Sequence, residues 1–116
     1  METWEEESGI PVTTALSEDD LALPPDVAIA VLGIVREALT NVGKHSSATH
    51  VWVDAQRGPD GLALAVRDDG RGFAADRPAG HGRRIMRDRA NSANIGLTIE
   101  SRPGQGTEVR VRYPRP

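Results

Sequence analysis

The chain contains 116 residues, with 14 Lys and Arg, 17 Asp and Glu, 3 His and no Cys, and its formal net charge is −3. This length fits one compact domain that can bury a core without staples. The lack of Cys excludes a disulfide framework and a thiolate metal site. No apolar run approaches the roughly 20 residues of a membrane span, and the acidic start is unlike a signal peptide, so we expect a soluble, cytoplasmic domain.

The charges are unevenly distributed along the chain. Residues 1–35 contain eight acidic residues and no Lys or Arg, whereas residues 36–116 contain all fourteen basic residues against nine acidic ones. This bias favours an anionic ligand in the later part of the chain. A nucleic acid is not expected, because the arginines are dispersed and the few aromatic residues form no stacking platform; these are Trp4, Trp52, Phe73 and Tyr113.

The N-terminal stretch predicts a loose end followed by a short strand. Residues 1–8 are acidic and poor in apolar side chains, which is typical of a weakly held terminus. Residues 9–15 contain a β-branched run bounded by turn residues, which indicates a strand. Pro11 lacks the N–H that a central strand needs, so we expect this strand at the edge of a sheet.

A long amphipathic helix is predicted from Pro25 to about Gly43. Pro24, Pro25 and Asp26 form a helix-start signal, because proline is tolerated in the first turn and an acidic residue suits the positive end of the helix dipole. Helical spacing places a set of apolar side chains on one face, which we expect to pack in the core: Val31, Leu32, Val35, Ala38, Leu39 and Val42.

The opposite face of this helix carries Glu37, Asn41 and Lys44, within about 60° of one another. A carboxylate, a carboxamide and an ammonium group supply a base or water-holding group, a neutral oxygen ligand for a hard cation, and a partner for phosphate. These are the groups that a magnesium-bound nucleoside triphosphate needs. The simpler interpretation is an ordinary solvated helix face, and the stripe alone leaves both open.

A β-hairpin is predicted next, with strands at 49–55 and 62–67 joined by a turn at 57–61. Its second strand leads into Asp68-Asp69-Gly70-Arg71-Gly72. The glycines there allow a sharp turn and a close approach of the backbone to a flat ligand. An ordinary Asp-Gly turn is the alternative interpretation.

A loop and a second helix follow this hairpin. Residues 73–79 are small and polar and are interrupted by Pro78, which predicts an irregular, mobile loop. Gly80-His81-Gly82 then precedes a helix predicted from Arg83 to about Ser92. Free N–H groups at the start of a helix bind phosphate well, so this glycine pair is a candidate phosphate contact.

A second hairpin is predicted at the end of the chain, with strands at 97–101 and 107–113 joined by residues 102–106. Both strands alternate polar and apolar side chains, which predicts a sheet with one solvated side. The order of strand, helix, hairpin, loop, helix and hairpin indicates an α/β fold. We expect a two-layer α/β sandwich, in which a mixed sheet of about five strands packs on about three helices.

The helix stripe and the three glycine-rich stretches together resemble the N box and the glycine-rich boxes of the GHKL ATPase superfamily, whose fold is the Bergerat fold. Residues 36–41 (Arg-Glu-Ala-Leu-Thr-Asn) and 86–90 (Met-Arg-Asp-Arg-Ala) look like the catalytic ATP-binding domain of a two-component sensor histidine kinase. The subfamily that partners NarL/LuxR-type response regulators is the most similar. The resemblance covers residues 9–113, with 1–8 as the end of a linker and 114–116 as a tail.

This resemblance implies ATP and Mg²⁺ as ligands. It assigns Glu37 and Asn41 to catalysis, with Asn41 also binding Mg²⁺ and ATP. It assigns Asp68 to accepting a hydrogen bond from the adenine amino group. The resemblance also implies that Gly70, Gly72 and Thr107 line the adenine pocket. It implies phosphate or lid contacts from six further residues: Lys44, His45, Gly80, His81, Gly82 and Arg83.

Two positions depart from the family pattern. Arg83 stands where relatives have a Leu that packs the lid, and residues 91–95 form a more polar turn than the usual Leu and Gly-Gly. Arg83 and its neighbour Arg84 could grip phosphates, or they could leave the lid less well ordered.

The expected function is that of a protein histidine kinase fragment, which positions Mg-ATP for γ-phosphoryl transfer to a histidine on a separate dimerisation domain. None of His45, His50 and His81 lies in a phosphoacceptor-like helical motif, so the fragment alone should not autophosphorylate. We expect a monomeric fragment of a homodimeric parent, with a NarL/LuxR-type response regulator as an indirect partner. The alternatives are a gyrase- or MutL-type ATPase, an anti-sigma-factor serine kinase, and a nucleotide-sensing or docking domain without catalysis.

Overall fold

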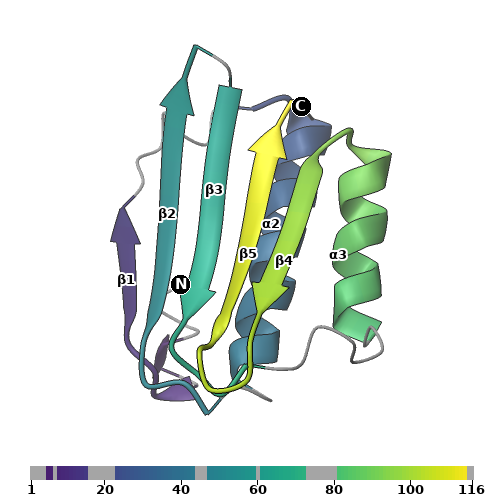
Figure 1. The fold of residues 1–116 in the computed structure, drawn as a ribbon. Helices are drawn as coiled ribbons and strands as arrows, with labels where there is room; N and C mark the ends of the chain where they lie inside the picture. Colours follow the sequence, from purple (N-terminus) through teal and green to yellow (C-terminus); the bar gives the residue numbers. More distant parts are fainter. Residues whose placement is uncertain are drawn as a thin grey trace.

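The computed structural model describes residues 5–6, 8–15, 23–43, 47–59, 61–72 and 81–114. Within these residues, five strands form one sheet and two helices pack against it (Figure 1). The elements are β1 (Val12–Ala15), α2 (Pro25–Asn41), β2 (Val51–Gly58), β3 (Gly61–Asp68), α3 (His81–Ser92), β4 (Gly96–Ser101) and β5 (Thr107–Tyr113). The predicted α/β sandwich with a five-stranded sheet is confirmed, with two helices in the described residues where we expected about three.

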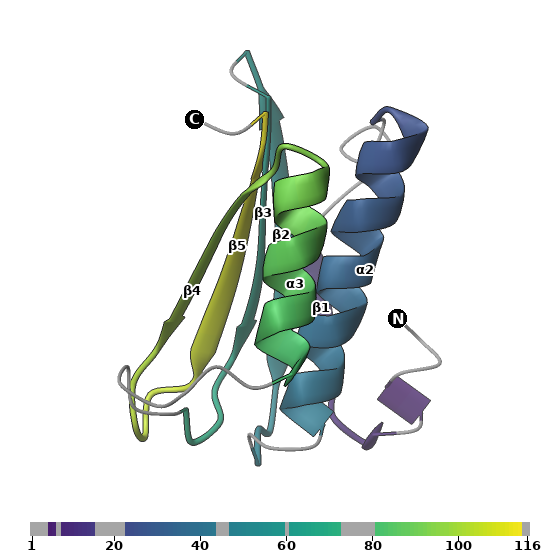
Figure 2. The same ribbon diagram turned by 90° about the vertical axis from the view of Figure 1, so that its right-hand side faces the viewer.

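The sheet is mixed, with the strand order β1-β2-β3-β5-β4. β1 runs parallel to β2, and the remaining neighbours are antiparallel. β1 lies at the edge, as Pro11 led us to expect. Both helices cover the same face of the sheet (Figure 2), which leaves the other face open. Within the described ranges, neither helix is long and apolar enough to cross a bilayer.

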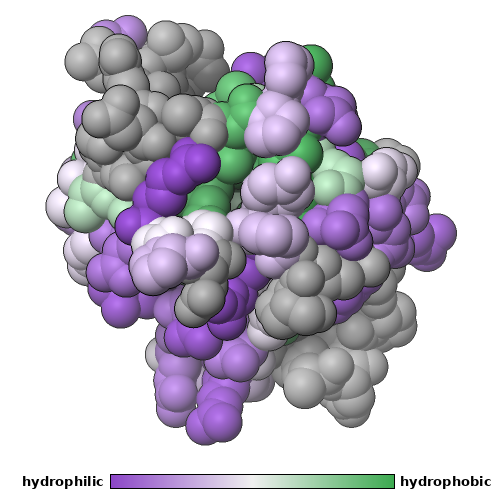
Figure 3. All heavy atoms as spheres, turned by 90° about the horizontal axis from the view of Figure 1, so that it is seen from above, coloured by the Kyte–Doolittle hydropathy of each residue, from purple (hydrophilic) through white to green (hydrophobic). Residues whose placement is uncertain are grey.

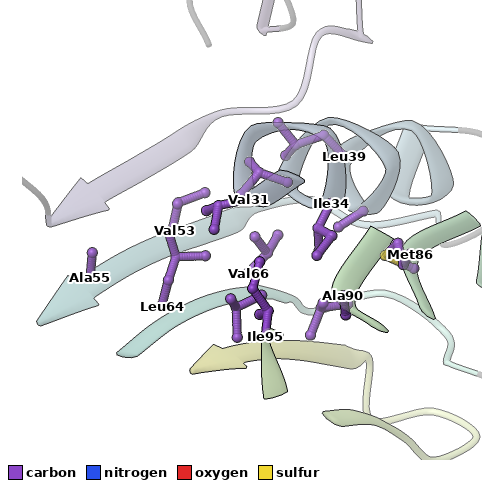
Figure 4. Packing of buried hydrophobic residues seen from close by; sticks show 14 of the residues in the cluster. Val31, Ile34, Leu39, Val53, Ala55, Leu64, Val66, Met86, Ala90 and Ile95 are labelled. Carbon is purple, nitrogen blue, oxygen red and sulfur yellow. The ribbon is translucent and has the colours of Figure 1, made fainter. Parts of the chain in front are cut away.

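The core lies between the two helices and the covered face of the sheet (Figure 4). Ile34 of α2, Val53 of β2 and Ile95 after α3 are fully buried, and Met86 of α3 is nearly so. Burying a side chain of this kind stabilises the fold by about 1.5–3 kcal/mol. Along β2 and β3, side chains that face the core alternate with side chains that face outward, as predicted.

The helix face that carries the polar stripe differs from our expectation in two ways. Leu32, which we placed in the core, is 51% exposed, and Ile29 is also exposed. Glu37 and Asn41 are half-buried and continue the strip that begins with the buried residues Ala30 and Ile34. Four- and three-residue spacing keeps these positions on one side of the helix, so Glu37 and Asn41 border the core and face α3, instead of lying opposite the core.

The two helices pack closely at two glycines, each of which faces a side chain of the other helix. A Cβ atom built on Gly33 of α2 would lie 2.8 Å from a guanidinium nitrogen of Arg89 on α3. Near the other end of the pair, a Cβ atom on Gly82 of α3 would meet Glu37 and Asn41 of α2. The absence of a side chain at both glycines therefore sets how near the helices lie along their length.

The turn after α3 has an asparagine at the left-handed position where helix-ending turns commonly have a glycine. Asn94 has a φ of 56°, a left-handed conformation that asparagine adopts more readily than most residues. The Ile95 N–H donates to the Ala90 carbonyl at 2.9 Å, and the Ile95 side chain is buried. These features match the hydrogen bond and hydrophobic contact that commonly close a helix, so the polar turn at 91–95 has regular geometry.

The first hairpin has a tighter turn than we expected. Its strands extend to Gly58 and from Gly61, and these two residues pair directly. Residues 57–61 therefore belong mostly to the strands. This turn lies at the same end of the molecule as the start of α2, and α2 and β3 end at the opposite end (Figure 1). Seen from above, the end with the β2–β3 turn shows hydrophobic residues among hydrophilic ones at its surface (Figure 3).

The turn between β4 and β5 packs against the loop that follows β3. A Cβ atom on Gly106 would overlap the backbone carbonyl of Asp68, and one on Gly72 would overlap the carbonyl of Arg102. The Gly104 N–H donates to the Arg71 carbonyl at 2.6 Å. The two backbone segments thus touch without intervening side chains, which requires glycine at both contact positions.

This contact predicts unequal effects for two glycines with nearly the same backbone conformation. Gly104 and Gly106 have φ angles of 78° and 79°, but a Cβ atom on Gly104 would meet nothing within 4 Å. Gly104→Ala should lower the free energy of unfolding by about 1 kcal/mol, the cost of a left-handed alanine. Gly106→Ala should cost about 3 kcal/mol or more, because it adds a backbone overlap. Denaturant titration measures both, and equal losses would contradict the contact.

Candidate functional site

The predicted motifs meet at one end of the molecule. Asn41 ends α2, Asp68 ends β3, Gly82 lies in the first turn of α3 and Thr107 begins β5. In Figure 1 these four positions lie at the lower end of the fold, where α2 and β3 end and α3 and β5 begin. Residues that are as much as 66 positions apart in sequence therefore share one region, as the four-motif pattern required.

Asp68 is the buried charged residue of the described part of the chain, with an exposed fraction of 5%. Its Oδ1 accepts a hydrogen bond from the Gly70 N–H at 2.8 Å, and the Thr107 N–H also donates to the carboxylate. Burial raises the pKa of Asp68, and the nearby charge of Asp69 raises it further, while the two backbone hydrogen bonds lower it. A buried carboxylate with a perturbed pKa is a candidate for binding a ligand.

Thr107 lies opposite Asp68 in the β3–β5 pairing and opposite Ser101 in the β4–β5 pairing. The Ser101 hydroxyl lies 2.8 Å from the Thr107 hydroxyl and donates to the Gly106 carbonyl at 3.0 Å. Ser101 therefore orients the threonine. Sequence reasoning missed it, although its place opposite Thr107 follows from the register of the predicted hairpin.

Gly82 brings the start of α3 against the polar stripe of α2. A Cβ atom built on Gly82 would lie 2.5 Å from Glu37 Oε1 and 2.9 Å from Asn41 Oδ1. Both side-chain oxygens therefore face the same point beside the first turn of α3. The structure therefore brings together three of the predicted residues: the carboxylate of Glu37, the carboxamide of Asn41, and Gly82. This set adjoins the first turn of α3, and the first N–H groups of a helix have no partner within that helix.

Asp69 contributes to the same end of the sheet, although the motif pattern gave it no role. Its carboxylate accepts three hydrogen bonds from Thr49 and His50. The Thr49 hydroxyl bond is the main reason that the pKa of Asp69 is lowered. The two neighbouring carboxylates are thus shifted in opposite directions, because one is buried and the other is exposed and hydrogen-bonded.

The remaining predicted residues are placed less completely. Gly70 is buried beside Asp68, Gly72 is half-buried, and Arg83 is half-buried in the first turn of α3. His81 begins α3, but its side chain lies outside the described residues, as do Lys44, His45 and Gly80. Their roles, and that of the expected lid at 73–79, stay predictions.

The donor set fits a hard cation shared with a phosphate-bearing ligand. Glu37 and Asn41 present a carboxylate and a carboxamide oxygen to one point, and oxygen ligands are what Mg²⁺ prefers. Mg²⁺ usually takes one or two protein ligands and completes its coordination with waters and substrate phosphates. The adenine-sized part of a nucleotide would then lie toward Asp68, whose carboxylate can accept a hydrogen bond from an amino group.

A separate hollow of about 550 Å³ lies between α3 and the β4–β5 hairpin. It is lined by arginines and small residues that include Arg87, Arg110, Arg112 and Thr98. None of the residues predicted to contact ATP or Mg²⁺ is among those that line it. The candidate site therefore rests on the residues that converge at the end of β3 and α2, and not on this hollow.

Comparison with known proteins identifies the class. Residues 26–116 match the family of histidine kinase-, DNA gyrase B- and HSP90-like ATPases. Nitrate/nitrite sensor protein NarX of Escherichia coli is 36% identical over 114 residues, which are 97% of this chain and 19% of NarX. The signal transduction histidine-protein kinase/phosphatase DegS of Brevibacillus brevis is 30% identical over 116 residues, which are 98% of this chain and 30% of DegS.

A solved structure agrees with these relatives. The histidine kinase domain of the blue-light activated histidine kinase from Erythrobacter litoralis superposes with a TM-score of 0.82 at 25% identity, over 97% of this chain and 60% of that one. The chain therefore belongs to the histidine kinase-, DNA gyrase B- and HSP90-like ATPase family. Within it, the chain is the ATP-binding catalytic domain of a sensor histidine kinase, as its motifs indicated. It spans less than a third of the curated relatives named above.

The opposite pKa shifts of Asp68 and Asp69 predict opposite pH dependences of stability. The folded state holds the Asp68 proton more tightly than the unfolded chain does, so this group stabilises the fold at low pH and loses that contribution as the pH rises through its folded pKa. Asp69 has a lowered pKa, so its contribution is present above the unfolded value of about 3.9 and is lost as the pH falls.

We therefore expect the stability of Asp68→Asn relative to the wild type to increase between about pH 3 and pH 7. The stability of Asp69→Asn relative to the wild type should decrease over the same range. At the buried Asp68, each tenfold difference in proton affinity between the folded and unfolded states contributes about 1.4 kcal/mol to the change in the free energy of unfolding. Denaturant unfolding across this pH range measures both slopes. Slopes of the same sign would show that burial and hydrogen bonding do not separate the two carboxylates.

Proposed function

We propose that this domain binds Mg-ATP at the lower end of the fold in Figure 1 and positions the γ-phosphoryl group for transfer to a histidine of a separate dimerisation domain of the parent protein. The observation that carries this proposal is the buried carboxylate of Asp68, which is held by the backbone of Gly70 and Thr107. Its remaining acceptor capacity suits the adenine amino group. Loss of one such charge-assisted hydrogen bond costs roughly 1.5–3 kcal/mol.

The adenine side of the proposed site is made of backbone and small side chains. Gly70 and Gly72 let the chain turn beside Asp68, and the hydroxyl of Thr107, which Ser101 holds at 2.8 Å, extends the polar wall. A flat base needs such a close approach of the backbone. These contacts would select a purine that carries an amino group.

The metal and phosphate side lies between the helices. Asn41 would hold Mg²⁺ through its carboxamide oxygen, and Glu37 would arrange metal, water or the incoming nucleophile. Mg²⁺ there would neutralise the charge of the phosphates, which together with positioning is what phosphoryl transfer requires. Gly82 and the N–H groups of the first turn of α3 suit phosphate binding, with Arg83, Lys44, His45, Gly80 and His81 as further proposed contacts.

The phosphoacceptor is proposed to lie outside this chain. His50, the one histidine whose side chain is described, stands just before β2, and its Nε2 lies 2.6 Å from the hydroxyl of Thr13. It is not on a helix. We propose that the parent is a homodimer that supplies the acceptor histidine and passes the phosphoryl group to a NarL/LuxR-type response regulator, in keeping with relatives such as NarX and DegS.

The proposal predicts that the chain alone binds ATP but neither labels itself nor hydrolyses ATP briskly. Positioning of the acceptor can account for ~7–11 kcal/mol of a barrier, so turnover should require the missing domain. The purified chain is incubated with γ-labelled ATP, alone and with the parent's dimerisation domain. Label should appear on the added domain, and Asp68→Asn or replacement of ATP by ITP, which lacks the amino group, should reduce it.

Two results would overturn this assignment. Stable labelling of His45, His50 or His81 in the chain alone would place the acceptor inside it. Vigorous hydrolysis that disappears in Glu37→Ala would favour a gyrase-like ATPase, in which a carboxylate activates water.

The geometry around Gly82 predicts a separate effect on metal dependence. Asn41→Ala should remove most of the gain in ATP affinity that Mg²⁺ provides. Gly82→Ala should remove part of it, because the added methyl group displaces the oxygens of Glu37 and Asn41. Since these are side-chain ends, the free energy of unfolding should change by about 0.5 kcal/mol or less. Calorimetry with ATP, with and without Mg²⁺, measures the gain.

Gly33→Ala is the matched control. Its methyl group would meet the end of the Arg89 side chain on the same helix pair, and it should leave the Mg²⁺ dependence unchanged. If Gly82→Ala behaves like Gly33→Ala, the two oxygens do not hold the metal. Tight Mg²⁺ binding without nucleotide would also contradict the assignment, because two side-chain oxygens leave most of the octahedral positions of Mg²⁺ to waters and phosphate oxygens.

A further inference from the structure

The outer edge of β4 is open in the described part of the chain. β4 is the last strand of the sheet, and within the described residues only β5 pairs with it. Every second residue of β4 therefore turns its N–H and C=O groups away from β5. An edge of this kind can accept a further strand from another chain.

The hollow of about 550 Å³ lies beside this edge, between β4 and α3. In Figure 1 α3 lies beyond β4, past the edge of the sheet, and Figure 2 shows α3 in the layer of helices. The hollow therefore has a strand edge on one side and a helix beneath it. Ala90 of α3 and the half-buried Leu97 of β4 give it an apolar floor.

The rim of the hollow is basic. It is formed by Arg87 of α3 and by Arg110 and Arg112 of β5. The two β5 arginines can reach the edge because the residues opposite them on β4 are small, namely Thr98 and Gly96. No carboxylate is among the residues that line the hollow. Within the described ranges, neither Arg87 nor Arg112 forms an ion pair.

Charge changes sign along the open face of the β4–β5 pair. Arg112 and Arg110 lie toward the start of β4, whereas Glu108 lies opposite Glu100, toward its end. Glu108 is also ion-paired with Arg110. A ligand with carboxylates is therefore attracted to the half of the edge that adjoins the hollow and is repelled from the other half.

We propose that the β4 edge is a docking site for an extended segment of a partner protein in which acidic and apolar side chains alternate. Its backbone pairs with β4, its acidic side chains lie beside Arg110 and Arg112, and its apolar side chains rest on Ala90 and Leu97. Alternation is required because successive side chains of a strand point to opposite faces. This surface is separate from the proposed ATP site, since none of the predicted ATP contacts lines the hollow.

A second copy of the chain and a free anion fit this place less well than a single strand. The sheet of a second copy would bring its own α3 into the space beyond β4 that α3 already occupies (Figure 1). A free anion uses the arginines but neither the strand edge nor the apolar floor. A single acidic strand uses all three features.

The probe is an end-capped synthetic peptide of alternating Glu and Val with six residues, the length of β4. It is titrated into the isotope-labelled chain, and amide chemical shifts are followed by NMR. A Lys–Val peptide is the control for charge. A Glu–Val peptide with methylated backbone nitrogens has the same charge but cannot donate hydrogen bonds to the edge. Only the unmodified Glu–Val peptide should shift the amides of residues 87–91 and 96–98, and it should bind more weakly at higher salt.

Arg87→Gln and Arg112→Gln test the rim. Both side chains are exposed, so the free energy of unfolding should be nearly unchanged. Each substitution should weaken binding of the Glu–Val peptide about threefold, and the two together about tenfold, as expected for partly exposed charge pairs. Arg36→Gln is the matched control, because Arg36 is an exposed arginine of α2 that does not line the hollow. This variant should bind the peptide like the wild type.

Four results would overturn the proposal in distinguishable ways. No amide shift at about 1 mM Glu–Val peptide would mean that the arginines only protect the edge from pairing. Equal binding of the methylated peptide would indicate an anion site without strand pairing. An equal loss in Arg36→Gln would show that only net charge matters. Dimerisation of the chain alone in sedimentation experiments, abolished by Arg112→Gln, would make a second copy the occupant.

Discussion

The site depends on one buried carboxylate and on the backbone that satisfies it. Asp68 ends β3, and its hydrogen bonds come from Gly70 in the next turn and from Thr107 at the start of β5. Gly70 is a local donor two residues after Asp68, whereas Thr107 is in place because β5 pairs with β3. The glycines at 72 and 106 permit the β4–β5 turn to lie against the loop after β3. A buried carboxylate without these donors would be strongly destabilising, so the pairing of β3 with β5 and the geometry of the adenine side are one structural requirement.

The metal side depends on a different contact, between two helices that the chain separates by 39 residues. Gly82 lets the start of α3 approach Glu37 and Asn41, and the core residues Ile34 and Met86 fix the helix pair above them. Because the two oxygens face the same point beside the first turn of α3, the packing that closes the core also orients Glu37 and Asn41. The two halves of the site therefore rest on separate elements.

Much of this arrangement could be predicted from the sequence. Alternation and turn residues predicted both hairpins, and the Pro and Asp at its start predicted α2, because these signals act between near neighbours in the chain. The placement of Leu32 was wrong for the complementary reason. A helical wheel gives the side of the helix on which a residue lies but not where a second helix packs, so it put the polar stripe opposite the core and Leu32 inside it. Ser101 and Asp69 were missed because the motif pattern gives them no role, and their partners emerge only once the predicted strands are aligned residue by residue.

The two sides of the proposed site are held in place by different kinds of structure. The adenine side is built from paired strands, whose ladder continues to Asp68 and Thr107, so its groups are in position before a ligand arrives and little entropy is lost there. The proposed phosphate side lies where α2 ends and α3 begins, so Glu37, Asn41 and Gly82 are held by the packing of two helices and not by a strand ladder. The hydrogen bonds of Asp69 lie beside the adenine side, since they join the residue after the β3 ladder to Thr49 and His50, the last two residues before β2.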